Sequence, residues 1–250
     1  MTILEHIKKA HENVKNQPKE ARWQYFWDYY KWHLIAVVLV IALLIQGTLA
    51  LVNKKDVAFS GILLNCKLGV DDEALWEEFF DYASIDGNTQ EAAIYSDLML
   101  NDGSTKSEVN TFQRIVAGIA TQDIDFVVGQ DASFRLCAYS TSKLFMDLRS
   151  FLDQATLDKL ADRLYYIDGA FLEKLSAPVG EYVDLSLNGA PDPTKPELME
   201  DPIPVGIDLS GFEAFQSAYY LPNTVSYLGV VVNVPRPELM RQFIEFLMLR

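Results

Sequence analysis

The side chains that most often carry out catalysis are poorly placed along this chain of 250 residues. Its three histidines, His6, His11 and His33, precede or adjoin the start of a long apolar run, and no histidine follows. Serine–histidine pairs, cysteine–histidine pairs and histidine-based zinc sites are therefore excluded from the rest of the chain. A glycine-rich phosphate loop is missing too, because Gly129 follows a predicted strand but the next glycine is Gly169. The sequence does not predict an enzyme.

Two groups of carboxylates could bind calcium or transfer protons. Asp71, Asp72 and Glu73 open a predicted helix, where acidic side chains usually complement the helix dipole. Asp123 and Asp125 flank a predicted strand, where alternate residues share one face. Paired carboxylates on a surface are commoner than catalytic pairs, so we predict neither a metal site nor a bound cofactor.

Two cysteines and three tyrosines each leave two interpretations open. A disulfide between Cys66 and Cys137 can form outside the cytoplasm, but the apolar neighbours of Cys137 favour two buried thiols. Tyr219, Tyr220 and Tyr227 form a candidate surface for a ligand or a partner, because tyrosine rings stack well and carry a polar tip. The same rings could equally pack in the core next to a predicted strand.

An apolar segment precedes the domain that must position these residues. From residue 34 to residue 52 the chain has 19 residues without a formal charge. As a helix they cover roughly 28 Å, close to the ~30 Å hydrocarbon core of a bilayer. Seven aromatic residues precede this segment, at the depth where such rings meet lipid headgroups. This membrane-interface belt consists of Trp23, Tyr25, Phe26, Trp27, Tyr29, Tyr30 and Trp32. The pattern predicts a transmembrane helix.

Charge predicts the orientation of this helix. Six basic residues precede it and only Lys54 and Lys55 follow closely, so the positive-inside rule places the N-terminus in the cytoplasm. The preceding segment is too long and too acidic for a signal peptide, and no clean cleavage site follows. We therefore expect three parts. They are a cytoplasmic amphipathic segment (1–22), the belt with the transmembrane helix (23–52), and an extracytoplasmic α/β domain (53–250).

The two sides of the predicted membrane helix differ in charge. The chain has 21 basic and 35 acidic residues, of which six and four lie up to His33, so the remainder has a net charge of −16. Such a domain will not bind nucleic acid through its phosphates. Its acidity fits either plain solvation of the surface or a basic partner.

Segment 1–22 has apolar residues at helical spacing between Ile3 and Val14, and is either a basic amphipathic helix or a frayed tail.

Strand and helix patterns alternate after Asp56. This order predicts an α/β fold with a mixed, mainly parallel sheet flanked by helices. The expected strands are 57–66, 92–100, 124–129, 181–187, 201–210 and 226–234. The expected helices are 71–84, 107–122, 132–145, 152–164 and 238–250.

The layout of residues 57–250 resembles one lobe of the periplasmic or extracellular solute-binding proteins of bacterial ABC importers. The segments that carry the resemblance are IDFVVGQDASF, then FMDLRSFLDQATLDKLADRLYYID, and finally SYLGVVVNVPRPELMRQFIEFLM. A complete binder encloses its ligand between two lobes. Only 198 residues follow the predicted membrane helix, so the resemblance implies about one lobe with a reduced second element. It supplies no ligand-binding residues.

Two functions follow from these observations. The favoured one is a single-pass, non-catalytic accessory subunit, whose extracytoplasmic domain contacts another membrane protein such as an ABC transporter permease. The alternative is a tethered solute-binding receptor that delivers its ligand to such a transporter. In both cases the lipid bilayer and a membrane protein are the expected partners, and nucleic acid is not.

Overall fold

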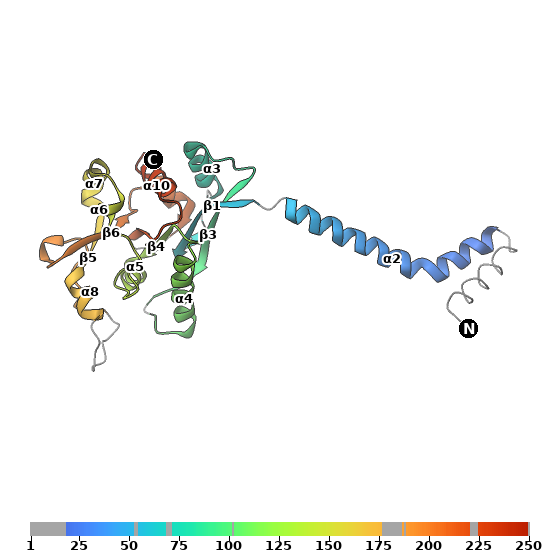
Figure 1. The fold of residues 1–250 in the computed structure, drawn as a ribbon, viewed down its shortest axis with the longest axis horizontal. Coiled ribbons are helices and arrows are strands. Elements are labelled where there is room, and N and C mark those ends of the chain that lie inside the picture. Colours follow the sequence, from blue (N-terminus) through green and yellow to red (C-terminus); the bar gives the residue numbers. More distant parts are fainter. Residues whose placement is uncertain are drawn as a thin grey trace. The chain divides into compact units, whose positions relative to one another are not determined.

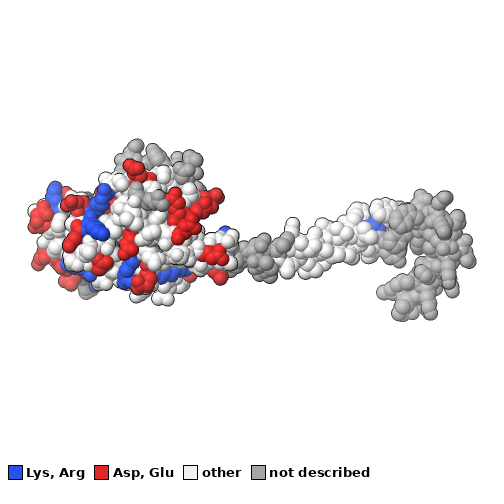
Figure 2. Space-filling view, turned by 90° about the horizontal axis from the view of Figure 1, so that it is seen from above, with Lys and Arg blue, Asp and Glu red and all other residues white. Residues whose placement is uncertain are grey.

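The computed structural model describes most of the chain, namely residues 19–52, 55–68, 72–101, 103–176, 187, 189–220 and 225–249. The chain divides into two compact units, Met1–Lys54 and Lys55–Arg250. The second unit, called the C-terminal domain below, contains the sheet and its covering helices (Figure 1). Acidic side chains are spread over the visible face of this domain, with fewer basic ones between them (Figure 2).

The described part of the first unit is one helix, α2 (Lys19–Val52). Within it, Lys31–Thr48 is long and apolar enough to cross a membrane, and none of this segment is buried inside the protein. The Thr48 hydroxyl donates to the carbonyl of Leu44, which satisfies its polarity within the helix. Such a helix is compatible with a membrane anchor or with a signal sequence.

The seven residues of the membrane-interface belt all lie within α2. The side chains of Trp27 and Trp32 are 53% and 70% exposed. Apolar side chains such as Leu39 and Leu43 further along the helix are exposed as well. Large apolar groups without a protein core around them are typical of a helix in contact with lipid. The role of the belt at the membrane surface remains a prediction.

We expect a reporter that is active only outside the cytoplasm, such as alkaline phosphatase, to be active when fused after Arg250. The physical reason is the excess of basic residues before the uncharged run that starts at residue 34, because such an excess favours a cytoplasmic N-terminus. The same reporter fused within the N-terminal segment should be inactive. The opposite pair of results would reverse the orientation.

Mass spectrometry of the mature protein complements the reporter, because an anchor and a cleaved signal peptide give the same result for a C-terminal fusion. An anchored protein retains residues 23–32. A mature N-terminus near Ala50 would show that α2 is removed as a signal sequence.

The C-terminal domain is built on a six-stranded mixed sheet with the strand order β3-β1-β4-β8-β6-β5. Its strands are β1 (Asp56–Leu64), β3 (Gln90–Leu98), β4 (Phe126–Gln130), β5 (Leu164–Asp168), β6 (Pro202–Asp208) and β8 (Ser226–Val230). β1 pairs in parallel with β3 and with β4, whereas the pairs β4–β8, β8–β6 and β6–β5 are antiparallel. A short antiparallel pair, β2 (Lys67–Leu68) with β7 (Tyr219–Tyr220), lies outside this sheet.

The predicted mixed α/β sheet is confirmed, but the prediction of a mainly parallel sheet is wrong beyond β4. The physical reason lies in the connections, since a parallel neighbour needs a crossover to the other end of the sheet. β5 ends at Asp168, which pairs with Pro202, the first residue of β6. Likewise, β6 ends at Asp208, which pairs with Tyr227 near the start of β8. Each connection brings the chain back at the same end of the sheet at which the preceding strand ended. The next strand therefore runs in the opposite direction, and the pair is antiparallel.

Helices cover both faces of the sheet (Figure 1). One buried cluster joins the sheet to α3 (Asp72–Ala83), α6 (Leu148–Phe151), α7 (Gln154–Leu160), α9 (Glu213–Ala218) and α10 (Pro237–Met248). The other joins it to α4 (Lys106–Ala120), α5 (Asp131–Ala138) and α8 (Gly169–Ser176). Strand residues alternate between the clusters: Phe126 and Val128 belong to the first, and Val127 between them belongs to the second.

The ends of two helices follow from their sequences. α4 begins with a capping box. The Glu108 backbone N–H donates to Thr105 Oγ1, and the Thr105 backbone N–H donates to the Glu108 carboxylate, each at a distance of 3.2 Å. α10 begins at Pro237, where a missing N–H is harmless.

Several predicted elements differ from the observed ones. The predicted helix 132–145 ends at Ala138, because the serines and threonine that follow favour a turn, and Phe145 pairs instead with Val231. Helices α8 and α9 were not predicted. The predicted strand 181–187 lies outside the described residues except for Leu187, which is not in a strand.

Candidate binding site

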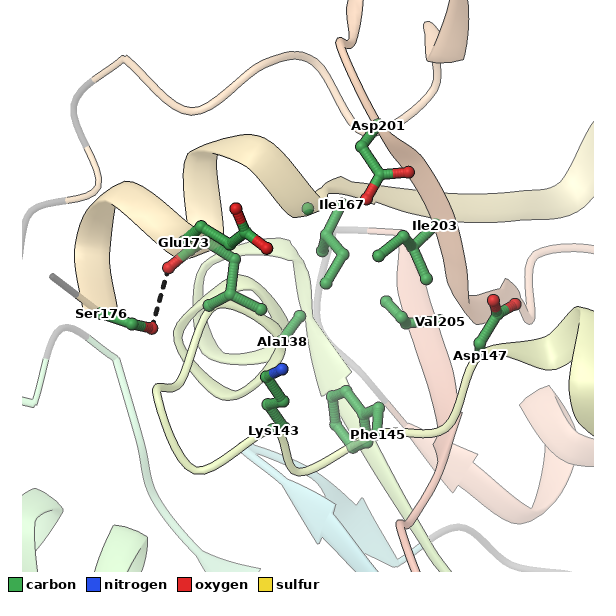
Figure 3. A pocket seen from close by; sticks show the side chains of 12 residues that line it. Ala138, Lys143, Phe145, Asp147, Ile167, Glu173, Ser176, Asp201, Ile203 and Val205 are labelled. Carbon is green, nitrogen blue, oxygen red and sulfur yellow. Dashed lines mark hydrogen bonds between the residues drawn. The ribbon is translucent and has the colours of Figure 1, made fainter.

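A pocket of about 380 Å³ lies between α8, strands β5 and β6, and the loop 139–147 (Figure 3). Its floor is apolar and is formed by Ile167 of β5 and by Ile203 and Val205 of β6. Ile167 and Ile203 are direct partners in the strand register, and Val205 lies two residues along on the same face. Strand alternation therefore presents three aliphatic side chains to one side of the sheet.

The walls of the pocket are also apolar. Leu172 projects from α8, and Phe145 projects from the loop 139–147. The Phe145 ring stacks on Phe134 at a centroid distance of 4.8 Å and an interplanar angle of 13°. This contact holds the loop against α5, so the wall is positioned by the buried core.

Charged side chains surround the mouth of the pocket. The charge of Asp147 is balanced within the protein, because its carboxylate accepts a hydrogen bond from Arg149 Nη2 at 2.7 Å and forms an ion pair with it. Lys143, Glu173 and Asp201 are exposed, and none of these three side chains forms a hydrogen bond or an ion pair with another described residue. The mouth therefore presents two carboxylates and one ammonium group that a ligand can engage.

Asp168 holds two sides of the pocket together. Its Oδ1 accepts the backbone N–H groups of Ala170 at 3.1 Å and Asp201 at 3.0 Å, and its Oδ2 accepts that of Glu200 at 3.3 Å. Its own backbone N–H donates to Tyr139 Oη at 3.1 Å. Burial raises the pKa of Asp168, but these backbone donors outweigh burial, so the pKa is lowered overall. The carboxylate thus joins the start of α8 to the two residues that precede β6.

The predicted tyrosine surface is not brought together. Tyr219 and Tyr227 are only 2% and 7% exposed and belong to different buried clusters. Tyr219 Oη accepts the indole N–H of Trp76 at 2.6 Å, and Tyr227 packs on Tyr165 at a centroid distance of 4.5 Å. The interpretation of Tyr219 and Tyr227 as an exposed aromatic surface is wrong, because helices cover both faces of the sheet and bury the two rings. The side chain of Tyr220 lies outside the described residues.

Two side chains with buried polar atoms, Tyr165 and Arg135, lie near Tyr227. The hydroxyl of Tyr165 and the Nε of Arg135 are buried and have no hydrogen-bond partner among the described residues. Arg135 Nη2 lies 3.3 Å from the Asp131 carboxylate. Burial raises the pKa of both phenols, that of Tyr227 to about 12, so both rings stay protonated. These groups belong to α5 and β5, which are in contact through the rings of Phe134 and Tyr165.

The carboxylates that were considered for chemistry do not form a site. Asp125 is fully buried and Asp123 is exposed, so the two are not a pair. Asp71 lies outside the described residues, α3 begins at Asp72, and Glu73 is exposed. Within the described part of the chain, no group of three or more His, Cys, Asp or Glu side chains is arranged to hold a metal ion.

Cys66 and Cys137 are not joined by a disulfide. They belong to the two buried clusters on opposite faces of the sheet. Burial raises the pKa of each thiol to about 12. Of the two interpretations given for these cysteines, the structure agrees with two buried thiols and not with a disulfide.

The residues of the pocket were not singled out in the sequence, since no local pattern connects Ile167 with Ile203 or places α8 beside them. No protein-family model, no curated protein and no solved structure matches the chain.

Proposed function

We propose that this protein is a single-pass, membrane-anchored accessory subunit without catalytic activity. Its C-terminal domain, on the extracytoplasmic side, binds another protein of the same membrane, such as an ABC transporter permease. The observation that carries the proposal is the open pocket on a domain that forms a single compact unit. Its exposed rim suits a group that projects from a partner.

A receptor for a small solute needs a different geometry. Small-ligand sites span roughly 300–1,000 Å³ and bury most of the ligand surface. The pocket of about 380 Å³ is at the low end of this range, and Lys143, Glu173 and Asp201 at its mouth face solvent. Residues 55–250 form one compact unit, so the described part of this domain has no second lobe of its own to enclose a ligand. These features favour contact with a protein surface.

The alternative is the tethered receptor for an ABC transporter. It is favoured by the resemblance to solute-binding proteins and by the combination of an apolar floor with charges of both signs at the mouth. That combination would also accept a small zwitterion. The two functions differ in what small solutes do to the stability of the domain.

We expect the melting temperature of the isolated C-terminal domain to change by less than about 1 °C across a panel of sugars, free amino acids and metal ions. A receptor with ligand at 100 times its Kd would gain about 2.7 kcal/mol. In a domain of this size 1 kcal/mol shifts the melting temperature by roughly 2–4 °C. Differential scanning fluorimetry resolves this difference easily. A saturable shift of several degrees with one solute would contradict the accessory-subunit proposal and support the receptor.

A further inference from the structure

We infer that the pocket receives an apolar side chain from an extended segment of the partner protein, and that this side chain is flanked by lysine or arginine. The inference rests on the proposed function, because it names the chemistry of the partner at the same pocket. Three observations lead to it: the apolar interior, the charges at the mouth, and the charge of the domain.

The floor of the pocket offers no polar side chain to a ligand. The floor is Ile167, Ile203 and Val205. The hydroxyl of Ser176, at the end of α8, already donates to the Leu172 carbonyl at 2.9 Å, as the dashed line in Figure 3 shows. A hydrogen-bonding group inserted here would lose its water without gaining a partner. An aliphatic side chain of the size of leucine or methionine satisfies the site.

The mouth of the pocket selects positive charge next to that side chain. In Figure 3, Asp201 lies above the three floor residues, Glu173 lies to their left and Lys143 lies below them. Arg149 pairs with Asp147 and also interacts electrostatically with Asp201. Counting Asp147, Glu173 and Asp201 against Lys143 and Arg149, one negative charge is left over, so a basic side chain is attracted on balance. Lys143 can donate to a backbone carbonyl of an extended segment.

The charge of the whole domain acts in the same direction. The residues after His33 have a net charge of −16. A field of this sign accelerates the approach of a basic partner and repels acidic ones. It also disfavours anionic lipid as the occupant. Because the rim side chains are exposed, the attraction should weaken as salt is added.

The test uses the full chain in detergent micelles and fluorescence anisotropy of labelled peptides with blocked ends. The probe is a short peptide with leucine between lysine and arginine. One comparison peptide has serine in place of leucine, and another has glutamate in place of both basic residues. Burial of a leucine side chain corresponds to roughly tenfold to 100-fold in affinity. We therefore expect the probe to bind, the serine peptide to bind at least tenfold more weakly, and the acidic peptide not to bind.

Matched variants locate the binding. Glu173→Lys reverses one rim charge and should weaken the probe about tenfold at low salt, with the effect lost at high salt. Glu213→Lys makes the same charge change at an exposed position of α9, a helix that packs on the other face of the sheet. This variant should leave the affinity for the probe unchanged within about twofold. Ile203→Trp fills the pocket and should abolish binding. Its melting temperature shows whether it is folded, and Glu173→Lys provides the test if it is not.

Several outcomes would overturn the inference. Equal binding of the leucine and serine peptides would exclude an apolar side chain in the pocket. Equal weakening by Glu173→Lys and Glu213→Lys would show that only the overall charge matters. Leucine amide that binds as tightly as the peptide would identify a small molecule as the occupant. If no peptide binds and the solute panel is also silent, this inference fails while the accessory-subunit proposal stands, because that proposal does not specify which side chain of the partner the pocket accepts.

Discussion

Replacing Arg236 with methionine is expected to destabilise the C-terminal domain by about 3–5 kcal/mol at pH 7. The Asp125 side chain is fully buried, and its Oδ2 accepts Arg236 Nη1 at 2.6 Å and the Ser60 backbone N–H at 2.8 Å. Its Oδ1 has no hydrogen-bond partner among the described residues. Removal of the guanidinium leaves a buried carboxylate without a counter-charge. Methionine preserves most of the length of the side chain, and the loss includes the hydrogen bond that Arg236 Nη2 donates to the Val57 carbonyl at 3.2 Å.

The destabilisation by Arg236→Met should decrease as the pH falls. Burial raises the pKa of Asp125 and Arg236 opposes this rise, so the pKa rises further in the variant. A raised pKa means that the folded state binds a proton that the unfolded chain has released. Stability is then gained as the pH falls through the raised pKa, and the gain is complete below the ordinary value of 3.8. Urea denaturation of both proteins between pH 7 and pH 4 measures this difference.

Arg149→Met is the matched control for the buried ion pair. Arg149 also pairs with an aspartate, since its Nη2 lies 2.7 Å from Asp147 Oδ2, but the two side chains are 54% and 33% exposed. Water solvates either partner when the other is removed, so we expect a loss below about 1 kcal/mol. Equal losses in the two variants, or a loss in Arg236→Met that does not change with pH, would contradict the assigned role of Asp125.

The second large effect is expected for Phe243→Ala, at about 3–5 kcal/mol. The fully buried Phe243 ring of α10 lies 5.0 Å from Phe79, 5.1 Å from Phe59 and 5.5 Å from Phe126, measured between ring centroids. These rings come from α3, β1 and β4, so the substitution opens a cavity where four elements meet. At roughly 2–4 °C per kcal/mol, the melting temperature should fall by about 10 °C.

Leu249→Ala provides the control for this cavity. Leu249 follows α10 and is 70% exposed, so its truncation should change the free energy of unfolding by no more than about 0.5 kcal/mol. If Phe243→Ala were as mild as Leu249→Ala, α10 would not be packed on the sheet. The two variants together therefore test whether the last helix is an integral part of the domain.

The sequence by itself determined the features that depend on neighbouring residues. The apolar run that became α2 could be recognised because its length and lack of charge are local properties. The succession β1, α3, β3, α4, β4 could be recognised because the period of apolar residues changes between strands and helices. In both cases the pattern lies within one segment, so no knowledge of distant residues was needed.

Tertiary structure alone decided which distant residues meet. Ile167 and Ile203 share the floor of the pocket only because the connection after β5 returns at the same end of the sheet and makes β6 its antiparallel neighbour. Tyr227 was a candidate for an exposed surface and is buried, because the exposure of a ring depends on the helices that cover it. Asp125 looked like half of a surface pair and is the buried partner of Arg236, 111 residues away. Strand pairing, burial and charge pairing are non-local, and no period within a segment encodes them.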